Sequence, residues 1–141
     1  MRFMMLMIPR GYENAAPGTL PDAGAVEAMM KYNDELQQAG VLLALDGLHP
    51  PSMGARVSFE GGKARVTDGP FAEAKEVLGG YWMIQVKSRE EAIAWACRCP
   101  GSDNEVIEIR QVQEFSDFTD EVKEVLSDYP ALAELENGAK K

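Results

Sequence analysis

Residues 79–97, GGYWMIQVKSREEAIAWAC, hold a predicted strand followed directly by a predicted helix. The aromatic and apolar run at residues 81–86 is typical of a β-strand. Ser88 and Glu91 then have the Ser-x-x-Glu spacing of a capping box, which predicts that a helix begins there. Pro100 and Gly101 end this helix. The fold therefore depends on whether the rest of the chain continues this strand-to-helix order.

The remaining sequence does continue the alternation. Apolar or alternating runs predict five further strands, at residues 3–8, 41–45, 55–59, 64–67 and 106–112. Asp22 is the predicted N-cap of another helix, which runs to about Ala39 and stops at Gly40. The order strand, helix, strand, hairpin, strand, helix, strand predicts an α+β, ferredoxin-like (split βαβ) fold, with an antiparallel sheet and both helices on one face. Because the other face also needs cover, we expect a symmetric homodimer with sheet against sheet.

Two turns lie in the middle of the chain. Gly61 and Gly62 separate two alternating runs, which predicts a β-hairpin with positive φ at both glycines. The second turn is residues 67–71, TDGPF, where Asp, Gly and Pro are all typical turn residues. It is followed by a polar stretch, residues 72–77, for which we predict helical character.

Composition narrows the class of protein. A chain of 141 residues with 45% hydrophobic residues has the size of one compact domain with its own core. A net charge of −9 disfavours direct binding of nucleic acid, and no apolar run is long enough to span a bilayer. The opening ten residues contain no small-residue cleavage site, so they predict a strand rather than a signal peptide. Cys97 and Cys99 are interpreted as reduced thiols of a cytoplasmic protein.

The end of the chain is acidic. Residues 114–136 carry eight acidic side chains against one lysine, Lys123. Such a run is typical of a solvated face or a tail, and it could also meet a basic surface on a partner protein. We therefore predict a main domain at residues 1–115 and an acidic helical extension at residues 116–141.

Residues 48–100, LHPPSMGARVSFEGGKARVTDGPFAEAKEVLGGYWMIQVKSREEAIAWACRCP, resemble the YCII-related family, and specifically its DGPF-domain branch. The tetrapeptide at residues 68–71 gives that branch its name, and the resemblance extends from Phe3 to about Phe115. It implies a ferredoxin-like fold that pairs into a dimeric α/β barrel. It also implies acid–base chemistry on small cyclic molecules by a His–Asp pair in a cleft. Because some members are encoded beside or fused to alternative sigma factors, it implies as an alternative a role in transcription initiation.

The His–Asp pair of the wider family is matched only in part. Asp68 is a counterpart of its aspartate. The family's histidine lies near the first helix, where this chain has none. The single histidine here is His49, at the end of the second strand. A pair in this protein would therefore be a different one.

Asp68 and His49 are the predicted catalytic residues, and each has a structural interpretation beside the functional one. Asp68 either caps its own turn or acts as a general acid or base at the end of the sheet. His49 is either a hydrogen-bonded surface group or a proton relay with Asp68, since histidine is the residue type that titrates near neutral pH.

Four further residues are predicted to contact a ligand: Asn33, Phe71, Lys75 and Tyr81. Asn33 lies in an apolar stripe with Val26, Met29 and Leu36, where a buried amide needs a backbone, water or ligand partner.

The other three lie in or beyond the DGPF turn. Tyr81 and Trp82 must point to opposite faces of their strand, either as core and interface residues or as part of a ligand site. Lys75 either neutralises an anionic ligand or pairs with Glu76.

No nucleotide-binding or metal-binding motif occurs in the sequence. We therefore predict a protein without cofactor or metal that binds a small cyclic or acidic molecule. If it is an enzyme, we expect a lyase or isomerase. The alternatives are a non-enzymatic partner of a sigma factor and a structural dimer.

Overall fold

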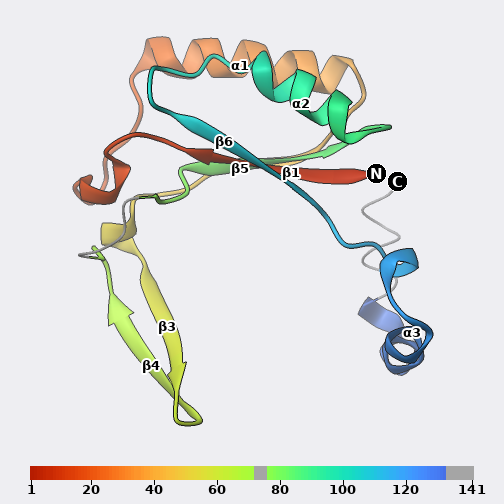
Figure 1. Ribbon diagram of the computed structural model, residues 1–141. Helices are drawn as coiled ribbons and strands as arrows, with labels where there is room; N and C mark the ends of the chain where they lie inside the picture. The colour runs from red at the N-terminus through yellow and green to blue at the C-terminus, as the bar shows by residue number, and fades with distance from the viewer. Residues whose placement is uncertain (72–75, 133–141) are drawn as a thin grey trace. The chain divides into compact units, whose positions relative to one another are not determined.

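The computed structural model describes residues 1–71 and 76–132 (Figure 1). The chain forms two compact units, residues 1–111 and residues 112–141. The first unit contains all strands of the described residues and two of their α-helices.

The first unit is built on a four-stranded antiparallel sheet with the strand order β2-β5-β1-β6. Its strands are β1 (Arg2–Ile8), β2 (Leu42–Gly47), β5 (Gly80–Gln85) and β6 (Val106–Gln111). Helices α1 (Ala23–Gln38) and α2 (Arg89–Cys97) lie together on one face of this sheet (Figure 1). The predicted α+β class is confirmed, and the arrangement is compatible with a ferredoxin-like fold.

Both helices begin at the predicted capping residues. The Asp22 side chain accepts a hydrogen bond from the Ala25 backbone N at 2.9 Å. The Ser88 hydroxyl accepts one from the Glu91 backbone N at 3.1 Å. The Glu91 carboxylate accepts from the backbone N of Lys87 at 2.9 Å, one residue before the position that a capping box predicts. These caps satisfy backbone donors that a helix N-terminus leaves free.

The two helices and the sheet enclose one apolar core. Its buried members come from both helices and from the sheet and its flanking residues: Phe3, Met5, Tyr32, Leu36, Val41, Trp82, Ile84, Val86 and Ala92. Tyr32 of α1 is buried, whereas Val26 of the predicted apolar stripe is 42% exposed. The Tyr32 ring packs edge-on against Trp82, and its hydroxyl donates to the Trp95 carbonyl at 2.7 Å. These two contacts explain why the side of α1 that carries Tyr32, rather than the side that carries Val26, packs against the core.

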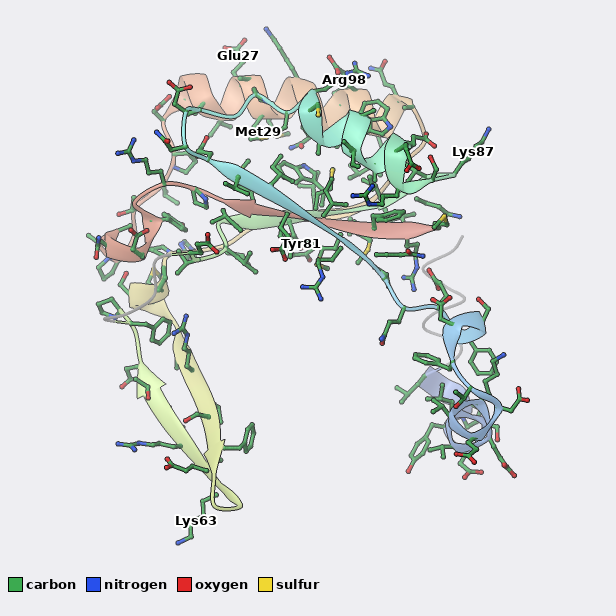
Figure 2. The ribbon with its side chains drawn as sticks, in the orientation of Figure 1. Glu27, Met29, Lys63, Tyr81, Lys87 and Arg98 are labelled. Atoms are coloured by element: carbon green, nitrogen blue, oxygen red, sulfur yellow. The ribbon has the colours of Figure 1, made fainter. Side chains whose placement is uncertain are left out.

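Strands β3 (Ala55–Glu60) and β4 (Lys63–Asp68) form a separate two-stranded sheet. Gly61 and Gly62 connect them with φ of 56° and 77°, which confirms the predicted hairpin. Lys63 is labelled beside this connection in Figure 2. Residues 76 and 77 are not helical, so the predicted helical character fails there, and residues 72–75 lie outside the described residues.

The second unit contains helix α3 (Asp120–Ser127). It begins later than predicted because the Thr119 hydroxyl caps it by accepting from the Val122 backbone N. Apolar side chains at helical spacing are exposed on this unit: Val122, Val125, Tyr129 and Leu132. Of the helices in the described ranges, none has the length and apolar character required to cross a membrane.

Candidate functional site

The loop after β1 packs against the segment after β2. The Tyr12 hydroxyl donates to the Leu48 carbonyl at 2.6 Å. The Ser52 hydroxyl donates to the Ala15 carbonyl at 3.0 Å. These bonds join two short 3₁₀ helices, Tyr12–Asn14 and Pro51–Met53, at one end of the sheet.

A cavity of about 510 Å³ lies at this end of the sheet, and we call it the His49 cavity. It is lined by Met7, Pro9, Tyr12, Thr19, Leu20, Pro21, Gly47, Leu48, His49 and Gly79. Two of its polar groups are already engaged, because the Tyr12 hydroxyl is bonded to Leu48 and the Thr19 hydroxyl donates to the Ala16 carbonyl at 2.6 Å. The His49 imidazole has no hydrogen bond within the described part of the chain. Among the polar side chains that line this cavity, His49 is therefore the one without a hydrogen bond to another described residue.

Gly79 closes the wall of this cavity. Its backbone N donates to the Met7 carbonyl at 2.8 Å, and its own carbonyl accepts from the Leu48 backbone N at 2.9 Å. A Cβ at this position would lie 2.7 Å from the Pro9 ring. Glycine at this position therefore allows the chain before β5 to pack closely against Pro9, which follows β1. The sequence pattern had marked Gly79 only as the start of a strand.

The DGPF turn contacts the segment that follows His49. The Gly69 backbone N donates to the Gly54 carbonyl at 2.9 Å. The Arg56 guanidinium lies 4.1 Å from the centroid of the Phe71 ring. Asp68 is exposed at the end of β4, lines neither cavity described in this section, and has no side-chain hydrogen bond to another described residue.

A second and larger cavity, of about 690 Å³, lies under α1, and we call it the α1 cavity. It is lined by Met7, Pro21, Ala25, Val26, Ala28, Met29, Met30, Asn33, Leu45, Asp46, Gly47, Gly79, Gly80, Tyr81, Trp82, Pro100, Ser102 and Glu105. Figure 2 shows Met29 on the side of α1 that faces the sheet and Glu27 on the opposite side. Four residues line both cavities, so the two adjoin: Met7, Pro21, Gly47 and Gly79.

Asn33 finds its main partner on the sheet. The Trp82 indole Nε1 donates to Asn33 Oδ1 at 2.7 Å, and both side chains are buried. The Trp82 indole is therefore the hydrogen-bond partner of the amide oxygen, and the sequence alone did not predict this partner. The bond also explains the orientation of Trp82, which points toward the helices.

Tyr81, the neighbour of Trp82, points to the other face of the sheet, as strand alternation predicts (Figure 2). Its hydroxyl donates to the Asp46 carboxylate at 2.7 Å. This hydrogen bond, together with the negative charge of Asp46, raises the pKa of Tyr81 above that of an ordinary phenol. The phenol therefore stays protonated at neutral pH and does not act as a base there.

The family model of the YCII-related domain matches residues 1–116. This chain belongs to the YCII-related domain family. It is also 39% identical over 59 residues to an uncharacterised protein of Rhizobium meliloti (strain 1021). That match covers 42% of this chain and 48% of the relative, so it spans about half of the relative's length.

The candidate site of this YCII-related protein contains some of the predicted residues and omits others. His49, Asn33 and Tyr81 line the two cavities, whereas Lys75 lies outside the described residues. Within residues 1–71 and 76–132, no group of three or more His, Cys, Asp or Glu side chains has an arrangement that could hold a metal ion.

Sequence reasoning missed two acidic residues that line the α1 cavity, Asp46 and Glu105. Asp46 follows the apolar run of β2 and could have been found by its place at a strand end. Glu105 lies before β6 in an irregular segment, and no local pattern marks it.

Cys99 is half-buried in this YCII-related protein, and Cys97 is exposed. Burial, with a smaller effect from the charge of Glu105, raises the pKa of the Cys99 thiol to about 11. Cys99 is therefore a packing residue rather than a nucleophile at neutral pH.

Proposed function

We propose that this YCII-related protein binds a small cyclic organic molecule at the end of its sheet and transfers a proton on it without a cofactor, as a lyase or isomerase. One observation carries the proposal: the single histidine of the sequence lines a mainly apolar cavity of about 510 Å³. That volume lies within the range usual for small-ligand sites. The other polar side chains that line it, Tyr12 and Thr19, are bonded to backbone carbonyls.

In the proposed reaction, the neutral His49 imidazole accepts a proton from a C–H or O–H group of the bound molecule. The resulting imidazolium returns that proton to another atom of the molecule, which completes an isomerisation without any other reactant. We propose Asp68 as the group that stabilises the imidazolium. The contact between Gly69 and Gly54 supports this assignment, because it joins the turn that carries Asp68 to the segment that follows His49.

Replacing His49 by alanine is expected to lower the rate of proton exchange on a bound ligand by at least about 100-fold, which is the usual contribution of a general base. The measurement is deuterium uptake from D2O by cyclic ketones, phenols and cyclic acids, followed by NMR. Asp68→Asn should lower the same rate if Asp68 stabilises the imidazolium.

Lys63→Ala, a change at the hairpin connection, is the matched control and should leave the rate unchanged. Equal exchange rates for the wild-type protein and His49→Ala, across all three ligand classes, would rule out this function.

We further propose that the protein belongs to the DGPF branch and forms a homodimer with the geometry of a dimeric α/β barrel. Residues 68–71 support the branch, and the sheet face opposite the helices supports the dimer. This face carries Met4, Leu6, Tyr81 and Met83, all half-exposed, and helices α1 and α2 lie on the other face. A mass of one chain by light scattering at micromolar concentration would contradict the dimer.

A cytoplasmic location is part of the same proposal. The two free cysteines, Cys97 and Cys99, support it.

A regulatory role beside a sigma factor is the second candidate, and the second unit favours it. Helix α3 exposes Val122 and Val125 on one side and carries acidic residues such as Glu121 and Glu124. An amphipathic acidic helix of this kind suits an apolar groove with a basic rim. Binding of a purified sigma factor by the full chain, lost on removal of residues 116–141, would support this role.

A further inference from the structure

The α1 cavity has the walls of a ligand site. Its volume of about 690 Å³ lies within the range of small-molecule pockets. Its apolar lining comes from both layers of the fold, with Met29 and Met30 from α1 and Leu45 and Trp82 from the sheet. Such a cavity favours a mainly apolar molecule.

The side-chain amide of Asn33, which lines this cavity, has only part of its hydrogen-bonding capacity used. The indole N–H of Trp82 can only donate, so it must face the oxygen of the Asn33 amide. The amide nitrogen Nδ2 of Asn33 therefore points elsewhere, and its nearest partner is the Met30 sulfur at 3.6 Å. A thioether is a weak acceptor, and Nδ2 carries two N–H groups. No oxygen of a described residue accepts from it, although Asn33 is only 8% exposed.

The charged residues near Asn33 indicate which ligand charge the cavity accepts. Glu105 lines the α1 cavity, and none of the cavity's lining residues is Lys, Arg or His. The Glu105 carboxylate is held in place, because it accepts a hydrogen bond from the Ser102 backbone N at 2.7 Å. Asp46 also lines the cavity, but its carboxylate accepts from the Tyr81 hydroxyl on the other face of the sheet. An anionic ligand would meet like charge without a compensating cation.

We infer that the α1 cavity binds an uncharged, mainly apolar cyclic molecule through a carbonyl oxygen that accepts a hydrogen bond from Asn33 Nδ2. The apolar walls hold the ring, the amide fixes the carbonyl, and the Glu105 carboxylate disfavours acids. Trp82 acts as a positioning residue because it holds the amide with its donor toward the cavity. The inference extends the proposed function, since the two cavities adjoin, but its test needs no turnover.

Three probes of similar shape separate the contributions of a carbonyl oxygen, an apolar ring and a negative charge to binding. They are acetophenone, ethylbenzene and benzoate. They are titrated into the isotope-labelled full chain, and the NMR signals of the Asn33 side-chain amide and the Trp82 indole are followed. Acetophenone is expected to bind about tenfold more tightly than ethylbenzene, because it gives the buried donor an acceptor. Benzoate should bind more weakly than acetophenone, and the amide signals of Asn33 should move most with acetophenone.

Asn33→Asp is the matched variant, because it keeps an oxygen for the Trp82 indole and removes the NH2 group. The preference for acetophenone over ethylbenzene should then disappear. Met30→Leu, which replaces the thioether by an alkyl group of similar size, should keep the preference and provides a second variant if Asn33→Asp does not fold. His49→Ala should also keep the preference, so a failure of the proton-transfer proposal and a failure of this inference can be told apart.

Equal binding of acetophenone and ethylbenzene by the wild-type protein would overturn the inference. So would tightest binding of benzoate, an unchanged preference in Asn33→Asp, or no binding of any probe.

Discussion

Replacing Gly69 by alanine is expected to lower the free energy of unfolding by about 3 kcal/mol, a value typical of severe overpacking. A Cβ on Gly69 would lie 1.6 Å from the Pro51 carbonyl oxygen and 2.6 Å from its carbon. Those atoms belong to backbone, so the clash cannot be relieved by a side-chain rotation. The contact between the DGPF turn and the segment after His49 must open instead. Urea denaturation at one fixed protein concentration measures the loss.

Gly54→Ala is the matched control, because Gly54 takes part in the same contact. Its backbone is extended, and an added Cβ would lie 3.6 Å from the Pro51 oxygen, an ordinary van der Waals distance. We expect a change below about 1 kcal/mol for this variant. If Gly69→Ala were as stable as Gly54→Ala, the close packing of the turn on Pro51 would be wrong.

Replacing Trp82 by alanine is expected to cost about 3–5 kcal/mol of the free energy of unfolding, the usual range for a buried tryptophan. Trp82 is 5% exposed and packs edge-on against Tyr32 with ring centroids 5.7 Å apart. Its removal also leaves the Asn33 amide oxygen without a donor. Thermal and urea unfolding, read by far-UV circular dichroism, measure the change.

Trp82→Phe separates the hydrogen bond from the packing. It keeps a ring against Tyr32 and loses the donor to Asn33, so we expect about 1–3 kcal/mol. Tyr81→Phe, the adjacent change on the other face, removes a hydroxyl bound to the exposed Asp46 and should cost less than about 1 kcal/mol. An equal cost for the two Phe variants would contradict a structural role for the buried bond.

The helices and the hairpin could be predicted because their signals are local. Asp22 and Ser88 accept hydrogen bonds from backbone N–H groups three residues later, and Gly61 and Gly62 adopt the positive φ that a short hairpin needs. The helical character predicted for residues 76 and 77 failed, since Val77 is buried and Gly79 bonds to β1. A tertiary contact overrode a weak helical preference there.

The candidate site was predictable only in part. Asn33 drew attention as an amide in an apolar stripe, and the need for a partner was correctly inferred. The identity of that partner was not, because Trp82 lies 49 residues further along the chain. His49 could be named as the one histidine, but its cavity depends on the loop that carries Tyr12 folding back onto Leu48.

The sequence by itself determined the order of strands and helices, the capping of both main helices and the hairpin at Gly61 and Gly62. These features depend on residues a few positions apart, whose backbone geometry is set by side-chain type. Tertiary structure alone decided that Trp82 orients the Asn33 amide, that Asn33 and Glu105 line the same cavity, and that Gly69 packs on Pro51. Each of these joins segments distant in the chain, and only the packing of the folded layers brings them within contact.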